Sequence, residues 1–261
     1  MREVPLLEVS AVTLTYRRAG KSFVAVKDAG LTVSEGEVIG IVGESGSGKS
    51  SLARCVMGLV RPDSGTVRLQ GESVGTRRTH QQRRFLQMVF QDPRSALNPR
   101  MSAFRIVNEA WQAHPEIAPE GPRRAAAAAL LARVGLDESA LDRRPEQASG
   151  GQAQRLSIAR ALAVAPRVLV LDEAVSALDV TVQSQILRLL AKLRADLGLA
   201  MVFISHDLGV IRQIADRVSV MHLGEVVETG DTGSVFDSPQ HEYTKTLLAG
   251  ALDLTVSGTA G

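Results

Sequence analysis

A glycine-rich segment at residues 43–50 has the residue types and spacing of a phosphate-binding loop, Gly-x-x-x-x-Gly-Lys-Ser. Glycines let the backbone turn tightly and approach an anion with no Cβ in the way. Lys49 would reach the β- and γ-phosphates of a nucleotide, and the hydroxyl of Ser50 would bind Mg²⁺. The residues expected to surround ATP are Gly43, Glu44, Ser45, Gly46, Ser47, Gly48, Lys49, Ser50 and Ser51.

The residues on both sides of this loop favour the same chemistry. The apolar, β-branched run Val38–Val42 is typical of a buried strand. Ser51–Met57 predicts a helix, with Leu52, Val56 and Leu59 spaced along one face. A strand, a tight turn and a helix N-terminus bring several backbone N–H groups to one point, which suits a polyphosphate. A chance match of the motif explains this context poorly.

Two adjacent acids, Asp172 and Glu173, directly follow the apolar run Val168–Leu171. An aspartate at the end of a buried strand beside a phosphate loop would hold Mg²⁺, directly or through water. Glu173 would polarise a water that attacks the γ-phosphate, if it lies within hydrogen-bond reach of that water. In isolation the pair would be two solvated loop acids, but the phosphate loop upstream favours a catalytic role.

A second anion site is predicted at Ser149-Gly150-Gly151-Gln152, where a hydroxyl, two glycines and a helix N-terminus coincide. Ser-Gly-Gly alone is a common turn. The helical run at 153–162, followed by Asp172 and Glu173, makes the signal specific.

Composition places the chain among ordinary globular proteins. It has 261 residues, of which 44% are hydrophobic and 22% charged, and a net charge of +2 argues against a dedicated nucleic-acid binder. Its one cysteine, Cys55, excludes an intrachain disulfide and a cysteine metal cluster, and we expect it to be a buried packing residue in a reducing compartment. We identify no secretory signal and no apolar run near the length of about 18 residues that spans a membrane. Any membrane role would therefore come through a partner.

Strands are predicted to alternate with helices, which indicates a parallel α/β core. Val and Thr enrichment predicts antiparallel strands at Leu7–Tyr16 and Phe23–Val33, joined by a turn at 19–21. The basic run at 77–84 is interpreted as a solvated helix or linker, with a phosphate-binding patch as the alternative. The other predicted elements are strands at 66–69, 88–90, 168–171, 201–204 and 218–221, and helices within 103–141, from 149, and at 182–197 with Gly198 as a C-terminal cap.

On these motifs the chain resembles an ABC-transporter ATPase from about Leu7 to about Leu248. The resemblance implies a P-loop NTPase (RecA-like) α/β fold with an antiparallel β subdomain and an inserted helical subdomain. It implies boundaries of about 4–36 and 60–75 for the β subdomain, 37–91 and 163–230 for the core, 92–162 for the helical subdomain and 231–261 for a C-terminal tail.

The resemblance also assigns roles to residues outside the phosphate loop. Gln91 would contact Mg²⁺ or water and face the membrane partner, and His206 would contact the γ-phosphate. Ser149, Gly150, Gly151 and Gln152 would form the family signature that caps ATP bound by a partner ATPase, with Asp179 at the seam. Tyr16 would stack on adenine, with Phe23 as the competing candidate and core packing as the alternative for both. Ala148 and Ala153 depart from the Leu and Arg common in the signature, which implies altered packing of the helical part.

The segments Phe90–Arg100 and Ser238–Leu248 look like those of peptide and nickel importers. This implies ATP hydrolysis with Mg²⁺ at the cytoplasmic face of a membrane, as a peripheral subunit that drives uptake of a peptide, nickel or metal-chelate type solute. The implied partners are a second ATPase subunit, two permeases and an extracytoplasmic solute-binding protein, with no nucleic acid. The rival is a soluble ABC-type ATPase acting on DNA or ribosomes, but the chain has no room for a long coiled-coil insertion and carries one cassette. A paralogue that binds ATP without hydrolysing it is disfavoured because Glu173 and His206 are present.

Overall fold

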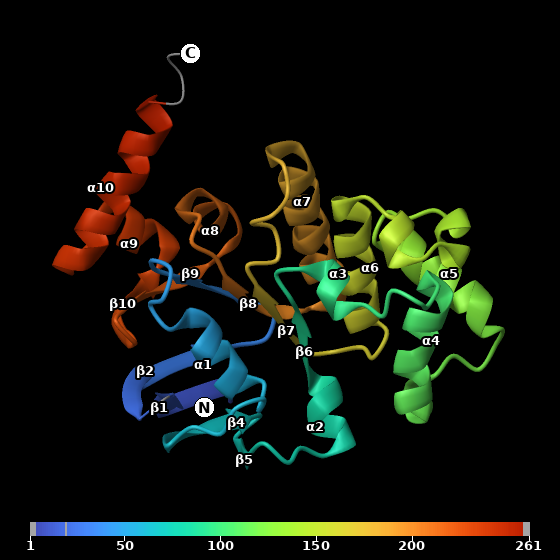
Figure 1. The fold of residues 1–261 in the computed structure, drawn as a ribbon, viewed down its shortest axis with the longest axis horizontal. Coiled ribbons are helices and arrows are strands. Elements are labelled where there is room, and N and C mark those ends of the chain that lie inside the picture. The colour runs from blue at the N-terminus through green and yellow to red at the C-terminus, as the bar shows by residue number, and fades with distance from the viewer. Residues whose placement is uncertain (1–3, 19, 258–261) are drawn as a thin grey trace. The chain divides into compact units, whose positions relative to one another are not determined.

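The computed structural model describes residues 4–18 and 20–257 (Figure 1). Contacts divide the chain into two compact units, one made of the residues up to 78 together with those from 200 onwards, the other of residues 79–199. The subdomain boundaries given above stay a prediction.

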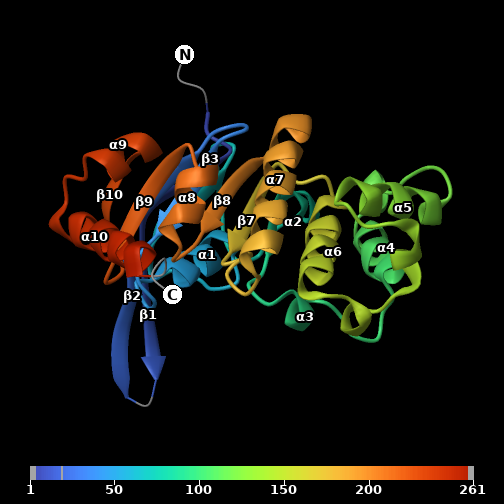
Figure 2. The ribbon, with the colours of Figure 1, turned by 90° about the horizontal axis from the view of Figure 1, so that it is seen from above.

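The first unit contains an antiparallel sheet of four strands in the order β2-β1-β4-β5. Its strands are β1 (Leu7–Arg18), β2 (Lys21–Val33), β4 (Ser64–Leu69) and β5 (Glu72–Val74). β1 and β2 form the predicted hairpin, and Figure 2 shows it reaching as a two-stranded ribbon beyond β3, β8 and β9 of the same unit.

The same unit contains four strands in the order β10-β9-β3-β8. β3 is parallel to both of its neighbours, whereas β10 is antiparallel to β9. Every residue of β3 and β8 is buried, as their continuous apolar sequences predict for parallel strands. The bounds are β3 Val38–Val42, β8 Ala200–Ile204, β9 Arg217–His222 and β10 Glu225–Asp231.

Helices α1 (Lys49–Val56), α8 (Leu208–Ile214), α9 (Thr232–Asp237) and α10 (Glu242–Ser257) complete the first unit. Leu52 and Val56 of α1 are buried as predicted, but Leu59 is 60% exposed. The helix has ended by then, because Gly58 takes a left-handed conformation with φ of 71°. The prediction that Leu59 continues the buried face is therefore wrong.

The second unit places β6 (Leu86–Val89) parallel to β7 (Val168–Asp172). The long helix α7 (Val180–Leu197) ends at Gly198 in the left-handed conformation, as predicted. The other helices are α2 (His80–Phe85), α3 (Pro93–Ala96), α4 (Ala103–Ala113), α5 (Arg123–Arg133) and α6 (Gly150–Leu162), with short 3₁₀ turns at Pro115–Ile117, Glu138–Asp142 and Pro145–Gln147.

Helices α4, α5 and α6 pack against one another (Figure 2). Trp111 of α4 is 5% exposed, and its indole N–H donates to the carbonyl of Ala163 over 2.9 Å. Trp111 is thus a packing residue of this group of helices. Within the described residues, no helix combines the length and apolar character needed to cross a bilayer.

The basic run at 77–84 differs from its predicted solvated state at one residue. Thr79 caps α2 through a reciprocal pair of hydrogen bonds with Gln82, and α2 buries none of its residues. Arg78, however, is only 8% exposed, and its guanidinium donates to the carbonyls of Val56 and Gly75. Arg78 is a buried cap on the C-terminus of α1, where a cation interacts favourably with the helix dipole.

Candidate nucleotide-binding site

The phosphate loop connects β3 to α1 and is built on glycines in conformations that other residues avoid. Gly43, Gly46 and Gly48 have φ values of 150°, 83° and 107°. A Cβ on Gly43 would lie 2.1 Å from the carbonyl oxygen of Met221, and one on Gly48 would lie 2.3 Å from that of Ala25. These glycines let the loop pack directly against β9 and β2.

Lys49 lies inside this loop and is only 4% exposed. Its ammonium donates to the carbonyls of Gly43 and Glu44 over 2.8 and 2.7 Å and to Ser47 Oγ over 3.3 Å. The N-cap of α1 is Gly48, so the positive end of the helix opens directly onto the loop. An enclosed ammonium, glycine backbone and a helix N-terminus together fit a polyphosphate.

Hydrogen bonds from other elements of the first unit hold the phosphate loop in place. Gly224, in the turn between β9 and β10, donates its N–H to the carbonyl of Ser47 over 2.9 Å and accepts the N–H of Lys27 over 2.8 Å. The N–H of Glu44 donates to the hydroxyl of Tyr243 over 3.2 Å. No sequence motif predicts a role for Tyr243; the only signal around it is the family-like segment at 238–248.

The two aromatic candidates for adenine stacking, Tyr16 and Phe23, are direct partners in the β1–β2 ladder. Directly opposed residues project from the same face of an antiparallel pair. Phe23 is 62% exposed, whereas Tyr16 is half-buried and its hydroxyl has no hydrogen-bond partner within the described part of the chain. The hairpin therefore presents both rings on one face, and the choice between them stays a prediction.

His206 lies in the connection that follows β8 in the first unit. The hydroxyl of the buried Ser205 accepts the N–H of Asp207 over 2.9 Å, and Asp207 caps α8 by accepting the N–H of Val210 over 3.1 Å. These bonds fix the backbone on both sides of the exposed His206.

In the second unit, parallel strands bring Gln91 and Glu173 together. β6 and β7 pair with Val89 opposite Leu171, so the residues two positions further on lie beside each other. The amide Nε2 of Gln91 donates to Oε2 of Glu173 over 2.8 Å. Asp172 is the last residue of β7, next to this pair.

A tight turn fixes Glu173 and leads to Asp179. Glu173 has a left-handed φ of 48°, which is uncommon for a residue with a side chain. Ser176 donates both its N–H and its hydroxyl to the carbonyl of Glu173, over 3.1 and 2.9 Å. Asp179 then caps α7 by accepting the N–H of Val182 over 2.9 Å. Strained backbone of this kind is common at functional sites.

The predicted signature forms the N-terminus of α6. The hydroxyl of Ser149 accepts the N–H of Gln152 over 3.3 Å, and Gln152 Oε1 accepts the N–H of Ser149 over 3.0 Å. A Cβ on Gly151 would lie 2.6 Å from Val182 Cγ1, so this glycine allows α6 to approach α7 closely.

The two alanines that depart from the family pattern, Ala148 and Ala153, lie on either side of the signature residues. Ala153 is completely buried, and the carbonyl of Ala148 accepts a hydrogen bond from Arg94 over 2.9 Å. The end of α6 that carries Ser149 is thereby held to the segment after Gln91.

The described residues contain no group of three or more His, Cys, Asp or Glu side chains placed to hold a metal ion. Mg²⁺ in a nucleotide site is usually bound by one or two protein oxygens together with substrate phosphates and water. The metal-binding roles of Ser50, in the first unit, and Asp172, in the second, stay predictions.

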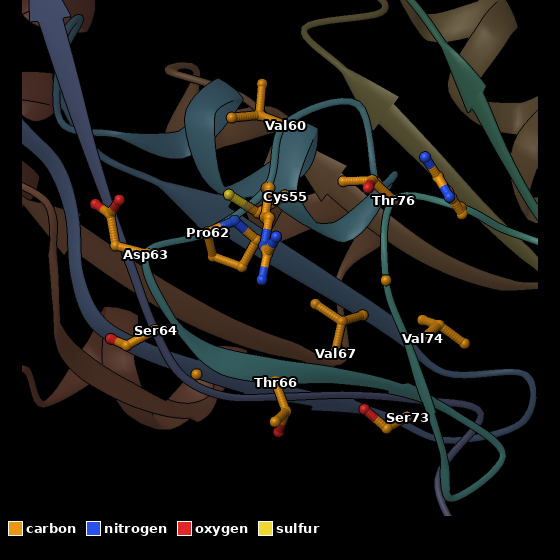
Figure 3. A pocket seen from close by; sticks show the side chains of 15 residues that line it. Cys55, Val60, Pro62, Asp63, Ser64, Thr66, Val67, Ser73, Val74 and Thr76 are labelled. Carbon is orange, nitrogen blue, oxygen red and sulfur yellow. The ribbon is translucent and has the colours of Figure 1, made fainter.

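A separate cavity of about 670 Å³ lies in the first unit, between the end of α1, β4 and β5. Figure 3 shows Cys55, Asp63, Thr66, Ser73 and Thr76 among its lining side chains. None of the residues predicted to bind nucleotide lines it.

The predicted site residues thus form two sets, one in each unit. The first contains the phosphate loop, Tyr16 and His206, and the second contains Gln91, Asp172, Glu173, Asp179 and the signature. A glycine loop with an enclosed lysine, between a buried strand of a parallel sheet and a helix, defines a phosphate-loop nucleotide-binding protein of the α/β class.

Comparison with known proteins identifies the family. The family model described as ABC transporter matches residues 26–176. The chain is 41% identical over 248 residues to an oligopeptide transport ATP-binding protein of Streptococcus mutans, with 94% of this chain and 80% of that protein covered. The chain therefore belongs to the ABC transporter family, as an ATP-binding cassette, and the predicted resemblance is confirmed.

Other relatives carry related names. The chain is 47% identical over 230 residues to a protein of Sinorhizobium fredii named as a probable peptide ABC transporter ATP-binding protein, covering 87% of this chain and 65%, about two thirds, of that protein. It is 48% identical over 225 residues to a protein of Escherichia coli named as a probable D,D-dipeptide transport ATP-binding protein, covering 86% of this chain and 69% of that protein.

Solved structures confirm the predicted fold class. A component of an ABC transporter complex from Clostridium perfringens aligns with a TM-score of 0.78 at 30% identity, covering 90% of this chain and 92% of that chain. A dimeric ATP-binding cassette in a post-hydrolysis state, bound to ADP and Pi, aligns with a TM-score of 0.75 at 30% identity, covering 87% and 98%.

Proposed function

We propose that this chain is the ATP-hydrolysing subunit of an ABC importer, and that hydrolysis drives the uptake of a peptide-type solute. The observation that carries the proposal is the buried ammonium of Lys49, held among the carbonyls of a glycine loop that opens onto a helix N-terminus. The names of the relatives favour peptides over the nickel or metal-chelate solutes that the sequence motifs left open. They also favour a transporter over an ATPase acting on DNA or ribosomes.

Within this proposal, phosphoryl transfer to water depends on positioning and on stabilisation of charge. Lys49 and the loop N–H groups bind and orient the phosphates, and His206 holds the γ-phosphate. Glu173 accepts a proton from the attacking water. The side-chain amide of Gln91 orients the Glu173 carboxylate through a hydrogen bond of 2.8 Å. Ser50, Asp172 and Gln91 are the residues that would hold Mg²⁺, which would supply further positive charge beside the phosphates.

The signature is proposed to cap ATP bound by a second subunit, with Asp179 at the interface between the two subunits. Its residues are Ser149, Gly150, Gly151 and Gln152. One solved relative is dimeric and another is part of a transporter complex, which supports an assembly with a partner cassette and membrane permeases. We therefore place the chain as a peripheral subunit at the cytoplasmic face of a membrane, working with two permeases and an extracytoplasmic solute-binding protein.

The test is phosphate release from ATP by the purified chain. Wild-type protein should hydrolyse ATP with Mg²⁺ present, and Lys49→Ala should lose most of this activity because the phosphates lose their buried cation. A thermal melt of Lys49→Ala provides the control for folding. Equal turnover by a folded Lys49→Ala protein and the wild type would refute the assignment of the loop.

A further inference from the structure

We infer that Tyr243 is a positioning residue for the phosphate loop, and that its hydroxyl fixes the Gly43–Glu44 peptide so that the carbonyl of this peptide faces Lys49. The inference rests on the proposed function, because it assigns the orientation of the nucleotide loop to a residue of the C-terminal helix α10. Tyr243 lies 199 positions from Glu44 in the sequence, so only the fold brings the two together.

One peptide bond joins the two contacts of the loop. The carbonyl of Gly43 and the N–H of Glu44 belong to the same planar peptide, and in a trans peptide they point in opposite directions. The carbonyl accepts the ammonium of Lys49 over 2.8 Å, and the N–H donates to Tyr243 Oη over 3.2 Å. Lys49 and Tyr243 therefore hold opposite ends of a single peptide plane, and all peptide bonds described are trans.

This peptide needs an external restraint. Gly43 has φ of 150°, and a glycine can populate conformations on both sides of the Ramachandran map. If the Gly43–Glu44 peptide rotated by half a turn, its N–H would face Lys49 and its carbonyl would face Tyr243. Lys49 would then lose the Gly43 carbonyl as an acceptor. The ammonium of Lys49 can only donate, so it requires the carbonyl on its side of the peptide. The hydroxyl of Tyr243 accepts the N–H on the opposite side and so adds a second hydrogen bond to the same orientation.

Tyr243 is itself held rigidly. Its ring stacks on His222 at the end of β9, with centroids 3.8 Å apart and planes inclined by 18°. Just before α10, the carboxylate of Glu228 accepts the N–H groups of Gln240 and His241 over 2.8 and 3.0 Å. These contacts fix the start of α10 on β10, so the tyrosine is preorganised to receive the loop.

The test measures ATP affinity of the purified full chain by calorimetric titration, for the wild type and for Tyr243→Phe. The phenylalanine keeps the stack on His222 and removes only the hydroxyl. We expect roughly a three- to tenfold weaker affinity, the effect of one lost hydrogen bond. Steady-state hydrolysis should show a raised KM for ATP with unchanged kcat, because the hydroxyl contacts the loop and not the reacting water.

The matched control is Thr246→Ala, one turn further along α10. Its hydroxyl donates to the carbonyl of Glu242 in the same helix and does not contact the loop, so ATP affinity should be unchanged. A purely structural role of Tyr243 would lower the melting temperature and the active fraction of protein while leaving the affinity of the folded fraction unchanged, which would overturn the inference.

Unchanged affinity of Tyr243→Phe, with normal binding by the wild type, would overturn this inference alone. A wild-type chain that binds no ATP would overturn the proposed function and the inference with it.

Discussion

The side-chain amide of Gln91 donates to the carboxylate of Glu173, with 2.8 Å between Nε2 and Oε2. The two residues follow adjacent parallel strands, β6 and β7, whose register places them side by side. The hydrogen bond restrains the orientation of the Glu173 carboxylate. The residue predicted to face the membrane partner, Gln91, thus contacts the residue predicted to act on the attacking water, Glu173.

The first prediction concerns this contact. Gln91→Ala removes the donor that orients Glu173, so kcat for ATP hydrolysis should fall roughly ten- to a hundredfold, the effect of a hydrogen bond to a charged group. Steady-state ATPase assays measure it. Gln87→Ala is the matched control, because Gln87 on the same strand donates to the carbonyl of Arg83 and does not contact Glu173. Equal kcat for Gln91→Ala and the control would show that Glu173 does not depend on this amide.

The second prediction concerns the thiol of Cys55, which lies 2% exposed in α1. Burial raises its pKa from an ordinary 9.0 to about 11. A thiol that stays protonated reacts slowly, so iodoacetamide at pH 8 should label the folded chain far more slowly than the chain in denaturant.

The same shift predicts a pH dependence of stability. Between pH 9 and 11 the unfolded thiol ionises while the folded thiol stays neutral, so the unfolded state binds fewer protons and the free energy of unfolding falls as the pH rises. Denaturation curves of the wild type and Cys55→Ala across this range check it, since the variant lacks this part of the decline. Rapid iodoacetamide labelling of the native chain at pH 8 would contradict the raised pKa of Cys55. So would the same pH dependence of the free energy of unfolding in the wild type and in Cys55→Ala.

The third prediction concerns the signature glycine Gly150. A Cβ there lies 3.5 Å from Leu178 Cδ2, an ordinary contact, so Gly150→Asp should fold. Its carboxylate would stand where the phosphates of a partner's ATP are proposed to bind, and repulsion between like charges should abolish most hydrolysis while the chain still binds ATP. Gly121→Asp is the control, because a Cβ at Gly121 has open space around it. Loss of ATP binding by monomeric Gly150→Asp would instead place the signature on the chain's own nucleotide.

Sequence motifs predicted the residues whose role depends on local backbone. The spacing of Lys49 from its glycines, the strand end before Asp172 and the capping pattern at Ser149 are all encoded within a few neighbouring positions. Periodicity failed at Leu59, because a single left-handed glycine ends the helix. Charge patterning failed at Arg78, since burial of a basic residue depends on which carbonyls the fold places around it.

Tyr243 shows the other limit of sequence reasoning. Tyr243 is distant in the sequence from Glu44, its partner in the phosphate loop. The Tyr243 hydroxyl accepts the backbone N–H of Glu44, so no side chain in the loop indicates this contact in the sequence. The family-like segment around it indicated a subgroup and gave no contact. Interactions of this kind become visible only when the strands and helices are placed in space.

The fourth prediction is that Glu173 activates water for ATP hydrolysis, and it is checked with Glu173→Gln. The variant keeps the shape of the side chain and removes its charge, so binding of ATP with Mg²⁺ should persist while phosphate release slows by on the order of 10²- to 10⁴-fold. Glu138→Gln, an exposed acid of the same unit, is the control and should hydrolyse ATP like the wild type. The decisive measurement is the single-turnover rate of phosphate release from bound ATP. We expect a slow rate with intact ATP binding, whereas a wild-type rate for Glu173→Gln would show that Glu173 does not activate the water.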